Sequence, residues 1–332
     1  MWCFGLSLFF LNQKGINAPI LERAVSFAEA IVPVAVKKPV TILAFGDMML
    51  DRKVREQIVA QGPEYPFALI KDFLKGNDIV VANAEGPFTD RPSVTMGVKD
   101  GPLNFTFDPA MLPILKNLGF TLFSQANNHA MNFGLASYQQ SISHIEEEGL
   151  GWFGDPRNID VAPYFQKVRG EKVAFIGYHE FAHRGLDNVL ETIKNAKKEA
   201  TFIVVYPHWG DEYQLEANDL QRETGHAFID AGADVVIGAH PHVIEPIEMY
   251  KNKVIFYSLG NFIFDQQANA PTGRGLAVKI SLTQDTATYD LFPLNIVKQQ
   301  AVLMSESDRT AQLAQLNLQS GEIVVSRDNY MK

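Results

Sequence analysis

The chain has 332 residues, 46% of them hydrophobic, which permits one large domain or two small ones with a sizeable buried core. Its formal net charge of −9 argues against a nucleic-acid partner, because binding to phosphates depends on an excess of lysine and arginine. Cys3 is the single cysteine of the sequence, so an intrachain disulfide and a cysteine-based zinc site are both excluded.

Residues 1–38 are interpreted as an N-terminal segment that precedes a domain over 39–332. Residues 1–11 are strongly apolar but too short to span a bilayer. They have three interpretations: the apolar part of a signal peptide that lacks a basic start, the remnant of a membrane anchor, or a buried N-terminal segment. Residues 24–30 predict a short helix. We therefore expect a location in the cell envelope, membrane-associated or extracytoplasmic, with the cytoplasm as the alternative.

Five strand-like runs are each followed by a side chain that can bind a metal ion. The runs cover residues 40–45, 78–82, 120–123, 202–206 and 234–237. The donors that follow them are Asp47, Glu85, Asn128, His208, His240 and His242. In an α/β sheet the loops at the carboxyl ends of the strands meet at one crevice. Oxygen and imidazole donors together suit borderline divalent ions, so we predict one or two ions of Mn, Fe, Co or Zn.

Each donor taken alone also has an ordinary structural explanation. A single histidine after a strand, such as His208, is more often a surface or hydrogen-bonded residue than a ligand. Asp47 occupies a position typical of a helix N-cap. Glu85 taken alone is explained as an acidic side chain of a loop that is exposed to solvent. The metal site is favoured because donors follow five different strands, whereas each of these explanations accounts for one residue.

Helical and extended patterns alternate along the chain, which predicts an α/β architecture. Apolar side chains at helical spacing predict helices at 66–75, 109–118, 135–148 and 217–231. Further strands are expected at 173–177 and 254–258. The last third of the chain predicts strands at 276–282, 287–292 and 296–302, then a helix and a strand at 323–325. We interpret the first three as an antiparallel second sheet, packed face to face on the first with helices outside.

Six short motifs occur together between residues 40 and 282. They are GDMMLDR at 46–52, NAEG at 83–86, ANNHA at 126–130, HWG at 208–210, GAHPH at 238–242 and SLGNF at 258–262. In this order and combination they resemble the CapA (PgsA) family of poly-γ-glutamate capsule biosynthesis proteins, within the calcineurin-like metallophosphatase superfamily. The resemblance implies a four-layer α/β/β/α sandwich, in agreement with the order of the predicted strands and helices.

The resemblance also implies which donors share an ion. Glu85 resembles the carboxylate that bridges two divalent ions. Three residues resemble the remaining protein ligands of one ion: Asn128, His208 and His240. Two resemble those of the other ion: Asp47 and His242. Such an ion activates water and polarises the bond to be cleaved.

Further residues are expected to act around the ions. His129 matches the position of a general acid or of a histidine that contacts phosphate. Arg52 is expected to hold an anionic substrate by bidentate hydrogen bonds. Arg274 and Asn261 are predicted to border the cleft and contact substrate, although Arg274 also suits a surface turn. Glu212 is expected to orient a ligand imidazole through its second nitrogen.

The motifs depart from the superfamily pattern at three places. Met49 stands where a histidine ligand is common. The ion held by Asp47 and His242 would therefore have one ligand fewer, and we expect it to be weakly bound, rich in water ligands or absent. Glu85 replaces an aspartate and so changes the spacing of the ions. Asn132 stands where the family often has an acid.

Two functions remain open on this basis. The first is a metal-dependent hydrolase that acts on a phosphoester of a small molecule or on an amide of an anionic polymer such as poly-γ-glutamate. The second is a non-catalytic accessory protein of capsule synthesis or export, which binds the polymer and other capsule-synthesis proteins.

Overall fold

The computed structural model describes residues 38–99, 101–266 and 271–327, nearly all within the compact unit Pro39–Lys332. The apolar segment 1–11 and the helix expected at 24–30 lie outside the described residues. Among the helices of the described ranges, none combines the length and the apolar character needed to cross a membrane.

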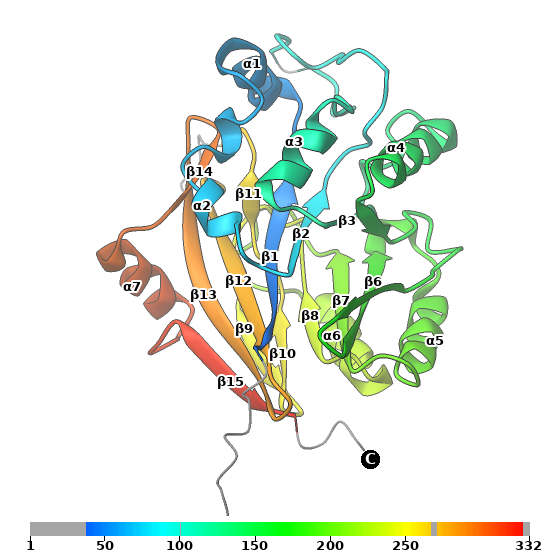
Figure 1. Cartoon of the computed structure of the whole chain (residues 1–332), viewed down its shortest axis with the longest axis vertical. Helices are drawn as coiled ribbons and strands as arrows, with labels where there is room; N and C mark the ends of the chain where they lie inside the picture. The colour runs from blue at the N-terminus through cyan, green and yellow to red at the C-terminus, as the bar shows by residue number, and fades with distance from the viewer. Residues whose placement is uncertain (1–37, 100, 267–270, 328–332) are drawn as a thin grey trace, which may run out of the picture. The chain divides into compact units, whose positions relative to one another are not determined.

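The first sheet is built around β1 (Val40–Met48) (Figure 1). On one side it continues in parallel through β2 (Ile79–Ala84), β3 (Leu122–Ser124) and β4 (Gly151–Phe153). On the other side lie the antiparallel strands β12 (Arg274–Leu282), β13 (Thr286–Val297) and β14 (Gln300–Leu303). The short β11 (Asn261–Ile263) pairs with the end of β1, and β15 (Glu322–Ser326) pairs with β13.

The second sheet has the strand order β5-β6-β7-β8-β10-β9 within the described residues. Its centre is parallel and consists of β6 (Glu171–His179), β7 (Phe202–His208), β8 (Val235–Ile237) and β10 (Lys253–Phe256). The antiparallel edges are β5 (Tyr164–Val168) and β9 (Ile247–Tyr250).

The helices follow the strands in sequence and cover the outer faces of the two sheets (Figure 1). Those near the first sheet are α1 (Arg52–Gln61), α2 (Lys71–Leu74), α3 (Met111–Leu118) and α4 (Leu135–Glu147), with a 3-10 turn η1 (Tyr65–Phe67). Those on the second sheet are α5 (Leu186–Ala196) and α6 (Asp219–Ala231), with a 3-10 turn η2 (Glu180–Ala182). Helix α7 (Glu306–Gln315) contacts β13.

Alternation along β1 shows how the layers are held together, because successive side chains of a strand point to opposite faces. Phe45 packs with Leu115 of α3 in a cluster on the outer face of the first sheet. Ala44, the neighbour of Phe45, packs with Val204 and Val235 of the second sheet in a cluster between the sheets. A third cluster joins α5 and α6 to the outer face of the second sheet. The predicted four-layer α/β/β/α sandwich is therefore confirmed.

The assignment of strands to sheets was wrong for the C-terminal region. Strands β12, β13 and β14 do not form the second sheet, because β12 pairs with β1 from Val40 opposite Leu282 to Ala44 opposite Val278. The second sheet comes instead from the middle of the chain. The helix expected at 66–75 is also divided into η1 and α2, with Ile70 as the N-cap of α2. Helix α1 begins after Asp51, whose carboxylate accepts from the Arg52 amide, so Asp51 and not Asp47 is the N-cap.

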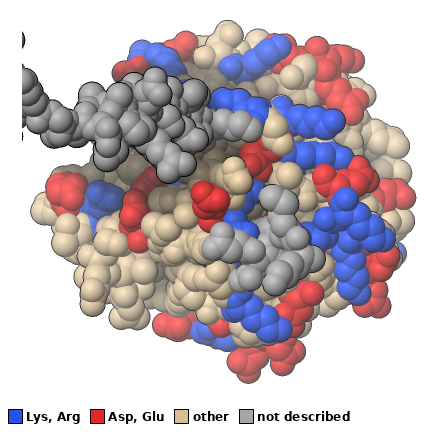
Figure 2. Space-filling model, turned by 60° about the horizontal axis from the view of Figure 1, so that its bottom comes forward, with Lys and Arg blue, Asp and Glu red and all other residues tan. Residues whose placement is uncertain are grey.

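The view in Figure 2 shows basic and acidic side chains interspersed on the surface. Ion pairs also lie near the amino ends of the parallel strands. Lys172 Nζ lies 2.5 Å from Glu199, and Lys253 Nζ lies 2.9 Å from Asp234. Because these cations have acidic partners, their positive charge is locally balanced.

Candidate metal centre

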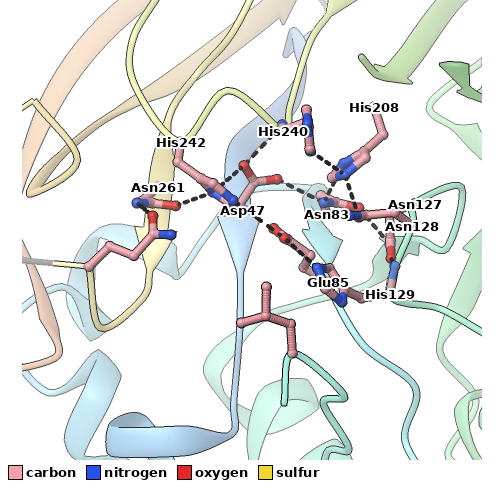
Figure 3. A network of polar contacts seen from close by, with 12 residues as sticks. Asp47, Asn83, Glu85, Asn127, Asn128, His129, His208, His240, His242 and Asn261 are labelled. Carbon is pink, nitrogen blue, oxygen red and sulfur yellow. Dashed lines mark hydrogen bonds and ion pairs between the residues drawn. The ribbon is translucent and has the colours of Figure 1, made fainter. Parts of the chain in front are cut away.

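The predicted donors meet where the carboxyl ends of the two sheets come together (Figure 3). Asp47 is the penultimate residue of β1, and its amide donates to Gly260 O at 3.0 Å. Gly46 makes this approach possible, since a Cβ there would lie 1.8 Å from Gly260 O. Glu85 follows β2 and Asn128 follows β3, whereas the histidines come from the ends of β7 and β8 in the second sheet. Both sheets therefore contribute to one site.

Asp47, Glu85 and His242 form one group of donors. One potential ligand atom from each lies within 4.8 Å of the others, and all three residues are buried. His242 Nδ1 lies 3.3 Å from Asp47 Oδ2, and His242 Nε2 lies 3.6 Å from Glu85 Oε1. The three side chains therefore occupy one small volume. Neither carboxylate oxygen of Glu85 accepts a hydrogen bond from the other two.

Glu85 is the least satisfied side chain of this group. Both carboxylate oxygens are buried and have no hydrogen-bond partner among the described residues. A buried, unpartnered carboxylate is costly, so such a group usually has a ligand or a special role. Burial raises the pKa of Glu85 well above its usual value. Together with the oxygen and imidazole neighbours, this arrangement fits a divalent cation.

The neighbours of Glu85 differ in charge. Burial alone would raise the pKa of the Asp47 carboxyl, but contacts with His242 and Asn83 hold it below its usual value. Burial opposes a charge on His242, yet Glu85 and Asp47 outweigh it and raise the pKa of His242 to about 9. Without an ion, a proton on His242 therefore balances part of the negative charge that a cation would balance.

Asn128, His208 and His240 form a second group. His208 Nε2 lies 2.9 Å from Asn128 Oδ1 and 3.1 Å from His240 Nδ1. Burial lowers the pKa of His240 to about 3 and that of His208 well below its usual value. Both rings are thus neutral at pH 7, which is the form that binds metal ions.

Asn83 links the two groups and was given no role by the sequence. Its Nδ2 donates to Asp47 Oδ1 at 2.8 Å and lies 3.2 Å from His208 Nδ1. Its Oδ1 accepts from Asn127 Nδ2 at 3.0 Å. The signal available in the sequence was its position directly after the strand run 78–82, two residues before Glu85.

The loop after β8 holds its histidines in an unusual backbone conformation. His240 has φ of 103° and His242 has φ of 59°, in a region that residues other than glycine rarely adopt. Conformations of this kind cost roughly 1–3 kcal/mol and are concentrated at functional sites. The Asp47 carboxylate stabilises the loop by accepting from the His240 amide at 3.0 Å.

His129 reaches the first group from the loop after β3. Its Nε2 lies 3.7 Å from Glu85 Oε1, and its ring packs 4.3 Å from the ring of Phe105. Asn132 Nδ2 donates to Leu103 O, and Asn132 Oδ1 lies 3.2 Å from His129 Nδ1. Asn132 Nδ2 lies 3.1 Å from the same ring nitrogen, and only the tautomer whose Nδ1–H donates to the amide oxygen turns an Nε2 lone pair toward Glu85. Burial lowers the pKa of His129 to about 4.

A pocket of about 180 Å³ opens beside the first group. Its lining residues are Arg52, Glu85, Leu103, Phe105, His129, Glu212, Tyr213, His242, Phe264 and Gln266. Arg52 has φ of 53°, and its Nε lies 3.2 Å from the buried carboxylate of Asp265. The pocket thus places the Arg52 guanidinium close to the donors.

The other predicted residues have different positions. Asn261 is buried and its Oδ1 lies 3.0 Å from His242 Nδ1, so it orients a donor imidazole. Glu212 is exposed and lines the pocket. Arg274 is not brought to the pocket, because its guanidinium donates to Gln312 of α7 at 3.0 Å. The sulfur of Met49 accepts from the Asp51 amide at 3.0 Å.

Comparisons with known proteins identify the family. Residues 41–266 match the family model described as bacterial capsule synthesis protein PGA_cap. The PGA biosynthesis protein CapA of Bacillus subtilis (strain 168) is 31% identical over 76% of this chain and 70% of its own length. The capsule biosynthesis protein CapA of Bacillus anthracis is 31% identical over 81% of this chain and 71% of its own. A crystal structure of a putative 5'-nucleotidase from Staphylococcus aureus in complex with alpha-ketoglutarate covers 84% of this chain and 58% of its own, at 14% identity and a TM-score of 0.45. The resemblance of the sequence motifs is thereby confirmed, and the chain belongs to the PGA_cap family of bacterial capsule synthesis proteins.

Proposed function

We propose that this protein is a metal-dependent hydrolase of capsule synthesis. Its substrate would be an anionic polymer such as poly-γ-glutamate, or a phosphoester. One observation carries the proposal: both oxygens of the buried Glu85 carboxylate lack a hydrogen bond among the described residues, and Oε1 lies 3.7 Å from His129 Nε2 and 3.6 Å from His242 Nε2. A bound cation would offset the cost of this arrangement.

The two donor groups would hold one ion each. Asp47, Glu85 and His242 supply two carboxylates and an imidazole, and Asn128, His208 and His240 supply an amide oxygen and two neutral imidazoles. Such mixed sets suit Mn, Fe or Zn. A bound ion supplies Lewis-acid polarisation of the bond to be cleaved and a nucleophile at neutral pH.

The remaining pocket residues would position the substrate and move its proton. Arg52 binds an anionic group with its two Nη groups, since its Nε is engaged by Asp265. In the tautomer that donates from Nδ1 to Asn132, His129 would present an unprotonated Nε2 to the pocket and act as a proton acceptor in the resting protein. It becomes a general acid only after it has taken a proton from water or substrate.

The alternative is a non-catalytic accessory protein that binds anionic polymer together with other capsule-synthesis proteins. The low pKa of His129 favours it, because an acid catalyst needs a proton near neutral pH. The names of the two Bacillus relatives, which refer to PGA and capsule biosynthesis, agree with either function. For both functions we propose a location in the cell envelope, where capsule polymer is found.

Metal content tests the proposal directly. Protein purified without chelator and incubated with Mn or Zn is analysed by mass spectrometry, beside Glu85→Ala and His208→Ala. We expect about two equivalents in the wild type and a loss in both variants. Glu245→Gln is the matched control, because Glu245 is also buried with an unpartnered oxygen but belongs to neither donor group. Metal-loaded protein is then assayed on phosphoesters and γ-glutamyl polymer.

The outcomes separate the two functions. About one equivalent, lost in His208→Ala alone, would restrict the site to the second donor group. Absence of bound metal even with excess Mn or Zn would overturn the hydrolase. Bound metal without turnover of either substrate class would favour the accessory protein.

A further inference from the structure

The pocket beside the donors contains charges of both signs. Arg52 and Glu212 line the same 180 Å³ volume, together with the rings of Phe105 and Tyr213. The Arg52 charge is already paired with Asp265, whose side chain is 1% exposed. Glu212 is exposed, and its side chain is hydrogen-bonded to that of Tyr213. A cation bound by Asp47 and Glu85 would neutralise their carboxylates. Glu212 would then be the remaining acidic side chain that lines the pocket.

An exposed carboxylate at this point affects which ligands fit. The interior of a γ-linked glutamate chain offers only carboxylates and amides, and Glu212 repels the carboxylates. The amino-terminal residue of the same chain differs, because its α-carbon carries both an ammonium and a carboxylate. Arg52 suits the carboxylate by a bidentate contact, and Glu212 suits the ammonium. A volume of about 180 Å³, several times the roughly 30 Å³ of one water, suits a single residue.

We propose that the pocket recognises the amino-terminal residue of an anionic chain, with Glu212 at its ammonium and Arg52 at its α-carboxylate. This inference rests on the proposed function and names its substrate as a chain end with a free α-amine. The side chain of that residue then extends toward Glu85 and His129, which line the inner part of the same pocket. Glu85 is buried, and its carboxylate oxygens lack a hydrogen-bond partner among the described residues, so this pocket offers an unsatisfied group to a ligand or its bound cation. Phe105 and Tyr213 pack on His129 and His242 and so form walls for the aliphatic part of the residue.

The test compares two probes on Mn-loaded full-length protein by calorimetry: γ-linked tetraglutamate with a free amino end, and the same peptide acetylated at that end. In the wild type we expect acetylation to weaken binding about fivefold, the upper range for an ion pair open to solvent. In Glu212→Gln the two peptides should bind equally. Glu216→Gln is the matched control, because Glu216 is exposed in the same loop and pairs with Arg222. It should keep the preference of the wild type.

Several results would overturn the inference. These are equal binding of both peptides to the wild type, a preference that persists in Glu212→Gln, or the failure of tetraglutamate to bind. The proposed hydrolase is judged separately, by metal content and turnover in the same preparations. A protein that binds metal and hydrolyses substrate without the amine preference retains the hydrolase and loses the chain-end site. A protein that shows the preference without metal or turnover retains the chain-end site and loses the hydrolase.

Discussion

Replacing Glu85 by glutamine should reverse the order of stability of two proteins when metal is added. In the unfolded chain at pH 8 the Glu85 carboxyl is ionised and hydrated. Folding without metal then either buries this charge beside the His242 imidazole without a hydrogen bond, or takes up a proton, because burial raises the pKa of Glu85. The glutamine amide is also a buried polar group, but it has no charge to bury and takes up no proton. An unsatisfied buried polar group costs about 1–3 kcal/mol when it is neutral and more when it is charged, so we expect Glu85→Gln to be about 2 kcal/mol more stable than the wild type in chelator.

With metal the difference should change sign. An ion that binds the folded state at 100 times its Kd stabilises it by about 2.7 kcal/mol. Only the wild type retains the Glu85 carboxylate for this ion. Metal binding should therefore give the wild type most of this stabilisation and give Glu85→Gln little of it. In a domain of this size about 1 kcal/mol moves Tm by roughly 2 °C. Differential scanning calorimetry at pH 8, in chelator and in excess MnCl2, would resolve both differences.

Glu245→Gln provides the control for this reversal. It also removes a buried acid with an unpartnered oxygen, but Glu245 accepts from Gln221 and belongs to neither donor group. It should be more stable than the wild type in both solutions and should respond to Mn as the wild type does. If Glu85→Gln is less stable than the wild type in chelator, Glu85 has favourable partners without metal and the reasoning is refuted. An equal response of both proteins to Mn would also refute it.

Three further predictions concern residues around the site. Asn132→Asp places a carboxylate at His129 Nδ1 and should raise the pKa of His129 from about 4 toward neutrality. NMR titration of the ring measures this pKa, and an unchanged midpoint would contradict the contact between residues 129 and 132. Burial raises the pKa of Glu245 to about 8 from 4.5, so the folded state holds a proton that the unfolded chain releases. The free energy of unfolding should therefore fall as pH rises from about 5 to 8, by up to about 5 kcal/mol, and urea unfolding of Glu245→Gln should lack this slope. Arg274→Ala should leave metal content and tetraglutamate affinity unchanged, because Arg274 contacts Gln312 of α7. A loss of either property would show that Arg274 acts at the cleft.

The donors were predictable from the sequence because strand ends and ligand residues coincide. Asp47, Glu85 and Asn128 follow predicted strands, and the polypeptide direction of parallel strands leads all of them to one edge. The same rule does not say which sheet a strand joins. His208 and His240 come from a second sheet whose parallel pairing depends on contacts between distant parts of the chain. Local periodicity contains no information on that pairing.

The direction of individual side chains was the other feature that the sequence could not predict. Arg274 follows Asn261 closely enough to suggest the cleft, but its guanidinium contacts α7, an element more than thirty residues further along. Asn83 gave no signal beyond its place after a strand, because an amide that bridges two donors looks like any loop asparagine. The pKa of His129 likewise follows from burial beside Phe105, which the sequence separates from it by more than twenty residues.

The two-sheet origin of the donors explains why an unpartnered Glu85 is tolerated. Asp47 and Glu85 belong to the first sheet, whereas His242 follows β8 of the second. Without an ion, the link between them relies on the Asp47–His242 contact and on the His240 amide. An ion shared by these donors would tie the carboxyl ends of both sheets together. The free energy that folding spends on burying Glu85 and on the strained backbone of His240 would then be recovered on metal binding.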